Sequence, residues 1–196
     1  MHRLILLACS LTTAFAAEHI FSVGIKGGVP LTDPISDRTF TGVDVVTHVF
    51  SDSKNYVIGP TVELNLPFGF SVEADALYRP INLTTETTVI PRSLTRISED
   101  IHSAEFPILG KYRFLHTPVV KPYVEAGPIF RYVAAPASYL SNAGFALGGG
   151  IELKVLVLKL SPEIRFSRWG SDAARSFVNT PPSNLNQAEF LIGISF

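Results

Sequence analysis

Apolar and polar residues alternate along most of the chain from His19 onward, with a period of two residues. This alternation is typical of β-strands in a sheet whose two faces meet different surroundings. No stretch keeps the 3.6-residue period of a helix over more than a few residues. Turn signals divide the pattern into eight predicted strands, at about 19–29, 55–66, 69–79, 103–114, 120–133, 143–154, 156–169 and 187–196.

The connections between these strands alternate in length. Residues 30–54, 80–102 and 170–187 make long connections, whereas 67–68 and 116–119 make short ones. An even-stranded meander through a membrane has this arrangement, with long loops on one side and short turns on the other. The sequence therefore predicts an all-β fold, an eight-stranded antiparallel up-and-down transmembrane β-barrel. Its long loops are expected outside the cell and both ends of the mature chain in the periplasm.

The two faces of each predicted strand differ in charge. In strand 69–79, Val72 and Tyr78 fall on one face, and Glu73 and Asp75 fall on the other. A soluble barrel turns its apolar face inward, whereas a membrane barrel turns that face toward lipid. Alternation alone does not decide between them. The loop lengths and the strand length favour the membrane barrel, because about ten residues tilted by about 45° cover roughly its 25 Å apolar band. A soluble lipocalin-like binding barrel is the alternative.

The N-terminus has the pattern of a secretory signal peptide at residues 1–16. A positive start at Met1-His2-Arg3 precedes a largely apolar stretch, and Ala14-Phe15-Ala16 offers a cleavage site. The mature region, 17–196, is then a single β-barrel domain. Because Cys9 lies within the signal, the mature chain has no cysteine and gains no stability from disulfides.

Composition excludes two other classes of protein. The chain has 196 residues, of which 46% are hydrophobic and 17% charged, and this apolar content argues against disorder. Lys and Arg number 16 against 17 Asp and Glu, so the basic excess of a nucleic-acid-binding protein is missing. After the first 17 residues, no apolar run approaches the roughly 18–20 residues that a membrane-spanning helix needs.

Three segments carry a resemblance to a known family. They are Phe21-Ser-Val-Gly-Ile-Lys-Gly-Gly28, the segment 123–132, and Phe190-Leu-Ile-Gly-Ile-Ser-Phe196. The chain resembles the small bacterial outer-membrane β-barrel proteins of the OmpA/OmpX type. The resemblance implies a Gram-negative outer membrane, contact with its lipid, and insertion by the barrel assembly machinery. Phe196, a terminal aromatic residue on an alternating strand, is similar to the assembly signal of that family.

The charged face predicts a salt-bridge network inside the barrel. Eight strands leave an interior about wide enough for side chains, and buried charges are tolerated there only when they are paired. Acidic and basic residues are nearly equal in number on this face, which also carries Lys26, Arg79 and Glu189. A narrow pore for small solutes is the alternative, although a conducting lumen would favour an excess of one sign. The proposed network consists of Glu63, Glu73, Asp75, Glu105, Lys111, Arg113, Glu125, Arg131, Glu152, Lys159, Glu163 and Arg165.

The sequence offers little that indicates catalysis. The nearest cluster of serine, histidine and acid is His102-Ser103-Ala104-Glu105. Adjacent His102 and Ser103 would point to opposite faces of a strand, so they cannot act together as base and nucleophile. No histidine spacing matches a metal site. We therefore expect no catalytic activity and no cofactor, and a structural or surface-interaction role through the long extracellular loops. Nothing in those loops indicates their ligand.

Overall fold

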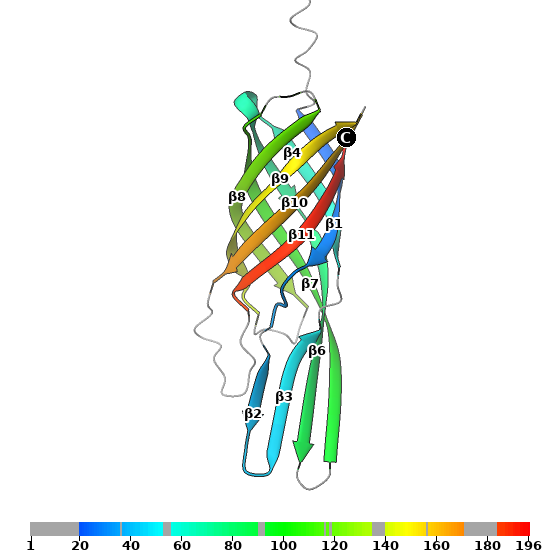
Figure 1. Ribbon diagram of the computed structural model, residues 1–196, viewed down its shortest axis with the longest axis vertical. Coiled ribbons are helices and arrows are strands. Elements are labelled where there is room, and N and C mark those ends of the chain that lie inside the picture. The colour runs from blue at the N-terminus through cyan, green and yellow to red at the C-terminus, as the bar shows by residue number, and fades with distance from the viewer. Residues whose placement is uncertain are drawn as a thin grey trace, which may run out of the picture.

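The computed structural model describes residues 20–35, 37–52, 56–89, 93–115, 117, 119–134, 140–155, 157–170 and 184–196. The predicted signal peptide, residues 1–16, lies outside these ranges. Figure 1 shows a tall barrel that continues at one end into a narrow sheet. The strands are β1 (Phe21–Pro30), β2 (Arg38–Thr41), β3 (Val45–Asp52), β4 (Val57–Asn65), β5 (Phe70–Asp75), β6 (Leu77–Val89), β7 (Ser93–Arg113), β8 (Val120–Val133), β9 (Ala143–Val155), β10 (Leu158–Trp169) and β11 (Asn186–Ser195), with a short 3-10 turn, η1 (Pro67–Gly69).

Eight antiparallel strands close into a barrel, as the sequence predicts. Around the wall, β1 is followed by β11, β10, β9, β8, β7, β5 with the start of β6, and β4. Strands β5 and β6 form one wall strand, interrupted at Ala76, whose amide donates to the carbonyl of Pro60. Strand β1 pairs with both β4 and β11, with Ile25 opposite Ile194. The expected pairing of the last strand with the first thus removes both open edges of the sheet.

The segments 30–54 and 80–102 differ from the expectation that they are loops. Strands β2 and β3 lie in the first segment, and the second contains the outer parts of β6 and β7. They pair in the order β2-β3-β6-β7 and project beyond the barrel, as Figure 1 shows. Most described side chains of this outer sheet are exposed or half-buried, and Val49 and Thr84 are buried exceptions. Neither face is a fully buried apolar face, so the strands lack the alternation of apolar and polar residues that marks the barrel. Their many Thr and Val residues nevertheless favour extended backbone.

The opposite end of the barrel has short turns. Turn η1 joins β4 to β5, and Phe68 and Gly69 adopt left-handed φ angles of 65° and 81° there. The end of β11 lies at the same end of the barrel (Figure 1). Within the described ranges, no helix is long and apolar enough to span a membrane.

Candidate functional site

The barrel wall has an apolar outer face and a charged inner face. On β10, Glu163 and Arg165 are buried, whereas Ile164 and Phe166 are 59% and 44% exposed. The same alternation runs along β5, β7, β8 and β11. Because charges are turned inward and large apolar side chains outward, the barrel has the arrangement expected in a lipid environment rather than in water.

The structure places eleven of the twelve residues proposed for the network in the buried interior, and Lys159 is half-buried at its rim. The buried ones are Glu63, Glu73, Asp75, Glu105, Lys111, Arg113, Glu125, Arg131, Glu152, Glu163 and Arg165.

Arg165 lies at the centre of the largest group of contacts. Its guanidinium contacts Asp75 at 3.0 Å, Glu125 at 3.1 Å and Glu163 at 2.8 Å. It also lies 3.4 Å from Glu73. These carboxylates come from β5, β8 and β10, so one side chain connects opposite walls of the barrel.

Two lysines complete this central layer. The ammonium groups of Lys26 and Lys111 each contact a different oxygen of Glu73. Lys26 also lies 3.2 Å from Glu163. Tyr123 donates a hydrogen bond of 2.7 Å to Glu163, and its ring lies 4.3 Å from the Lys111 ammonium. Each charge of the layer therefore faces a partner of opposite sign.

A second layer lies toward the short-turn end. Arg113 contacts Glu63 at 2.5 Å and Glu152 at 2.8 Å. The hydroxyl of Ser71 also donates to Glu63, at 2.5 Å. Lys159, at the rim, donates to the hydroxyl of Ser22 at 2.9 Å.

A third polar layer lies toward the outer sheet. Arg131 contacts Glu105 at 2.8 Å, and Arg79 approaches the same carboxylate at 3.4 Å. Both arginines also donate to the side-chain oxygen of Gln187. The guanidinium of Arg131 lies 3.7 Å from the centre of the Trp169 ring, which is a cation–π contact.

Apolar side chains separate and cover these layers. Along the inner face of β8, Ile129 stands between Glu125 and Arg131, and Leu77 stands between Asp75 and Arg79 along β5 and β6. Beyond the third layer, a buried apolar cluster lies at the mouth that faces the outer sheet. This mouth cluster consists of Ile35, Ile81, Ile101 and Leu140.

The interior leaves little room for a solute. A cavity bordered by Ser22, Lys26, Glu63 and Lys111 has a volume of only about 10 Å³, close to the minimum for one water molecule. At this level of the lumen, side chains therefore fill nearly all of the space.

Three carboxylates of the central layer are close enough to suggest a cation site. Oxygens of Glu73, Glu125 and Glu163 lie within 4.8 Å of one another. Lys26 and Arg165 contact the same groups. Because protein cations already supply the balancing charge, the arrangement is that of an ion-pair network rather than a metal centre.

Sequence reasoning did not single out Tyr123, Trp169 and Gln187 as interior residues. Alternation along β8 does put Tyr123 on the same face as Glu125, so the pattern could have identified it. Trp169 and Gln187 lie at strand ends next to a long connection, where the pattern fades. Their contacts with Arg131 arise only when β8, β10 and β11 meet in space.

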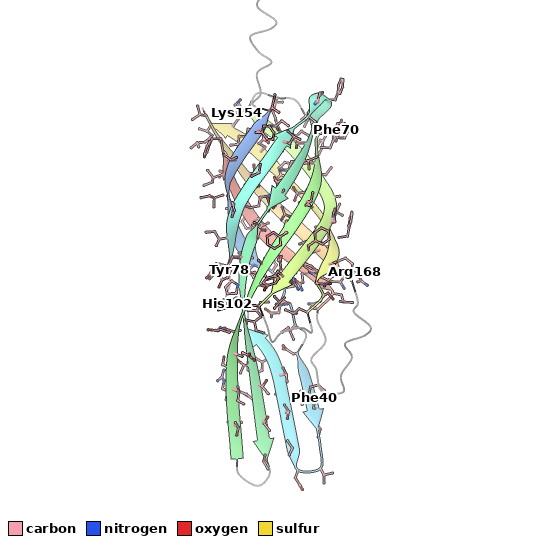
Figure 2. The ribbon with its side chains drawn as sticks, turned by 180° about the vertical axis from the view of Figure 1, so that it is seen from behind. Phe40, Phe70, Tyr78, His102, Lys154 and Arg168 are labelled. Carbon is pink, nitrogen blue, oxygen red and sulfur yellow. The ribbon has the colours of Figure 1, made fainter. Side chains whose placement is uncertain are left out.

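Aromatic side chains mark both ends of the apolar belt. Figure 2 shows Phe70 and Lys154 at the short-turn end, and Tyr78 and His102 where the outer sheet begins. The rings of Phe70 and Tyr112 lie 4.8 Å apart. At the other end, the Tyr78 hydroxyl and His102 Nδ1 share a hydrogen bond of 2.6 Å. Aromatic girdles of this kind are typical where a membrane barrel meets the two lipid–water interfaces.

No protein-family model matches the sequence, and no curated protein does. Among solved structures, the outer membrane protein OprG from Pseudomonas aeruginosa superposes with a TM-score of 0.55 and 16% identity, covering 89% of this chain and 94% of that chain. This chain has the fold of a bacterial outer-membrane β-barrel. The β domain of the Bordetella autotransporter BrkA aligns more distantly, with a TM-score of 0.38 and 9% identity over 90% of this chain and 98% of that chain.

This fold and the apolar exterior together give the location of the protein. Ile58, Phe106, Val124 and Ile194 are each 40–51% exposed and come from different parts of the wall. An exterior of this kind is stable only against hydrocarbon. The protein is located in the bacterial outer membrane, with lipid around its barrel.

Proposed function

We propose that the protein is a closed, non-catalytic barrel that presents its outer sheet to extended segments of other molecules at the cell surface. The main evidence for this proposal is one edge of β7. Residues 93–101 pair with β6 on one side, whereas pairing of β7 with β8 begins only at Ser103. Among the described strands, none covers the second edge over 94–99. Such an edge is a template on which an extended peptide can add as a further strand.

The side chains along this edge favour contact with a partner. Leu94 and Ile97 are 68% and 62% exposed, although they lie on a strand held in place by β6. Arg96, which contacts Glu86 at 3.5 Å, and Glu99 add charges of both signs nearby. Backbone pairing would supply affinity, and the exposed side chains would supply selectivity.

The packed interior supports a structural barrel over a pore. The mouth cluster covers three polar layers, and their charges contact one another across the lumen. Steady single-channel steps in planar bilayers would overturn this part of the proposal.

The placement of His102 and Ser103 supports the absence of hydrolase activity. The His102 side chain is exposed on the outer face of β7. Ser103 is buried on the inner face and donates to the carbonyl of Arg79 at 2.8 Å. The two groups lie on opposite sides of the wall, so histidine cannot take the serine proton.

Membership of the OmpA/OmpX type and insertion by the barrel assembly machinery belong to the same proposal. The eight-stranded wall and the exposed aromatic side chain of Phe196 at the end of the chain support both.

Peptide selection on the full-length protein in lipid nanodiscs tests the surface role. A library of random linear peptides should yield binders that slow amide hydrogen exchange over 94–99. Ile97→Lys, which puts a charge on the edge, should weaken their binding at least tenfold. Thr47→Lys, on the interior strand β3, should leave it within twofold. Binders that protect another region, or no binders at all, would contradict the proposal.

A further inference from the structure

The lipid-facing side of the barrel wall carries one charged side chain within the described strands, Arg168. Along β10, Ile164, Phe166 and Arg168 are exposed on the outward side, and the residues between them are buried in the lumen. The other outward positions of the described wall, on β1, β4, β5, β7 from Ser103 onward, β8, β9, β10 and β11, hold no Asp, Glu, Lys or Arg. A charge on this face is therefore an exception.

The lysines at the short-turn rim belong to the inner side of the wall. Lys121 lies directly opposite the buried Glu152 in the pairing of β8 with β9. Lys154 lies opposite Lys159, which donates a hydrogen bond inside the lumen. Directly opposed residues of antiparallel strands lie on the same face of the sheet. These lysines therefore share the inward face, and Arg168 has no charged counterpart on the outward side of the described wall.

Arg168 lies at the end of the apolar belt from which the outer sheet projects, as do Tyr78 and His102 (Figure 2). An outward arginine is strongly unfavourable at the middle of a bilayer and nearly neutral where the barrel meets the lipid headgroups. The position at the end of β10 therefore puts the guanidinium at headgroup level, in the leaflet at the outer-sheet end.

The guanidinium of Arg168 is oriented by Asn186. The two residues lie directly opposite each other in the pairing of β10 with β11, and Arg168 Nη1 donates to Asn186 Oδ1 at 2.5 Å. This bond uses one of the five N–H donors of the guanidinium. Two exposed aromatic side chains border the arginine. Phe145 lies opposite it on β9, and Phe166 precedes it on the outward side of β10; they are 54% and 44% exposed.

We propose that Arg168, positioned by Asn186, binds the phosphate of a phosphorylated lipid in the leaflet at the outer-sheet end. The guanidinium donates two parallel hydrogen bonds to phosphate oxygens, which its planar shape favours. The acyl chains of the same lipid lie along Phe166 and Phe145, toward the middle of the belt. The site is independent of the β7 edge and of the partners proposed for it.

Binding of radiolabelled phosphatidic acid to the full-length protein, folded in a neutral detergent, tests the site. Diacylglycerol with identical acyl chains is the comparison lipid, because it lacks only the phosphate. We expect the wild type to retain at least fivefold more phosphatidic acid than diacylglycerol. Inorganic phosphate in tenfold excess over the lipid should displace less than half of the bound phosphatidic acid, because the acyl chains contribute to binding.

Variants of the arginine locate the contact. Arg168→Gln should reduce the preference for phosphatidic acid to below twofold. Arg168→Lys keeps a point charge without the planar donor pair, so it should lower the preference less, and it provides a milder variant if the glutamine variant does not fold. Arg96→Gln is the matched control, because Arg96 is an exposed arginine of the outer sheet, and it should keep the wild-type preference.

Three results would overturn the proposal. The first is equal retention of the two lipids by the wild type. The second is an equal loss of preference in Arg168→Gln and Arg96→Gln, which would make the effect one of general surface charge. The third is complete displacement of the lipid by inorganic phosphate, since the site would then recognise the free anion and not the lipid.

Discussion

Arg165 shows how a single side chain stabilises this barrel. It is completely buried and lies within 4.0 Å of carboxylates on β5, β8, β10 and β11. In such a site, the cost of desolvating a charge is offset by several partners together. Removing the guanidinium leaves Asp75, Glu125 and Glu163 in close proximity without their shared cation.

We therefore expect Arg165→Ala to destabilise the folded barrel by about 3–5 kcal/mol. Reversible urea unfolding in detergent micelles would measure the change. Arg96→Ala is the control, because its pair with Glu86 is largely exposed and exposed pairs contribute about 0–1 kcal/mol. A loss below about 1 kcal/mol for Arg165→Ala would show that the network adjusts around the missing charge.

At the scale of the element, β11 is the strand that closes the barrel. Its inner face carries Gln187 and Glu189, and Ile192, Ile194 and Phe196 are exposed on its outer face. The backbone of Phe196 exchanges two hydrogen bonds with Val23, so the last residue still belongs to the closing pair of strands.

Deleting Phe196 should lower the amount of protein in the outer membrane several-fold, because it removes both closing bonds and the terminal aromatic side chain. Immunoblotting of outer-membrane fractions would measure this. Deletion of Ser183, which lies outside the described residues in the long connection before β11, is the control. Normal levels after both deletions would mean that β11 is an ordinary strand which tolerates loss of its end.

The outer sheet continues β6 and β7 beyond the barrel core. Thr85 on β6 pairs with Val49 on one side and Ile97 on the other. Thr85→Pro removes a ladder donor in the middle of this sheet, so it should abolish peptide binding at the β7 edge. Because the change lies beyond the barrel layers, the unfolding free energy should fall by less than about 1 kcal/mol. A collapse of barrel stability would show that the two parts fold as one unit.

At the scale of the whole molecule, the two ends of the barrel should face different compartments. Val43, in the turn between β2 and β3, is 97% exposed, and Phe68, in η1, is 86% exposed. The only native cysteine is Cys9, in the predicted signal peptide. Single Val43→Cys and Phe68→Cys variants therefore report one end each.

A membrane-impermeant maleimide should label Val43→Cys on intact cells and should label Phe68→Cys only after the outer membrane is permeabilised. The reverse labelling pattern would show that the barrel has the opposite orientation in the membrane.

The sequence by itself determined the barrel wall, because each wall strand separates lipid from a packed interior and must therefore alternate. That period of two puts Glu73, Lys111 and Arg165 on the charged face of their strands, and the loop and strand lengths favour turning this face inward. The outer sheet gave no such signal, since both of its faces meet water, and β2 and β3 read as a polar loop. Only the tertiary structure decided which charges meet. Arg165 contacts Asp75, which is 90 positions away in the sequence, because the closure of β1 on β11 curves the wall so that the two side chains meet in the lumen.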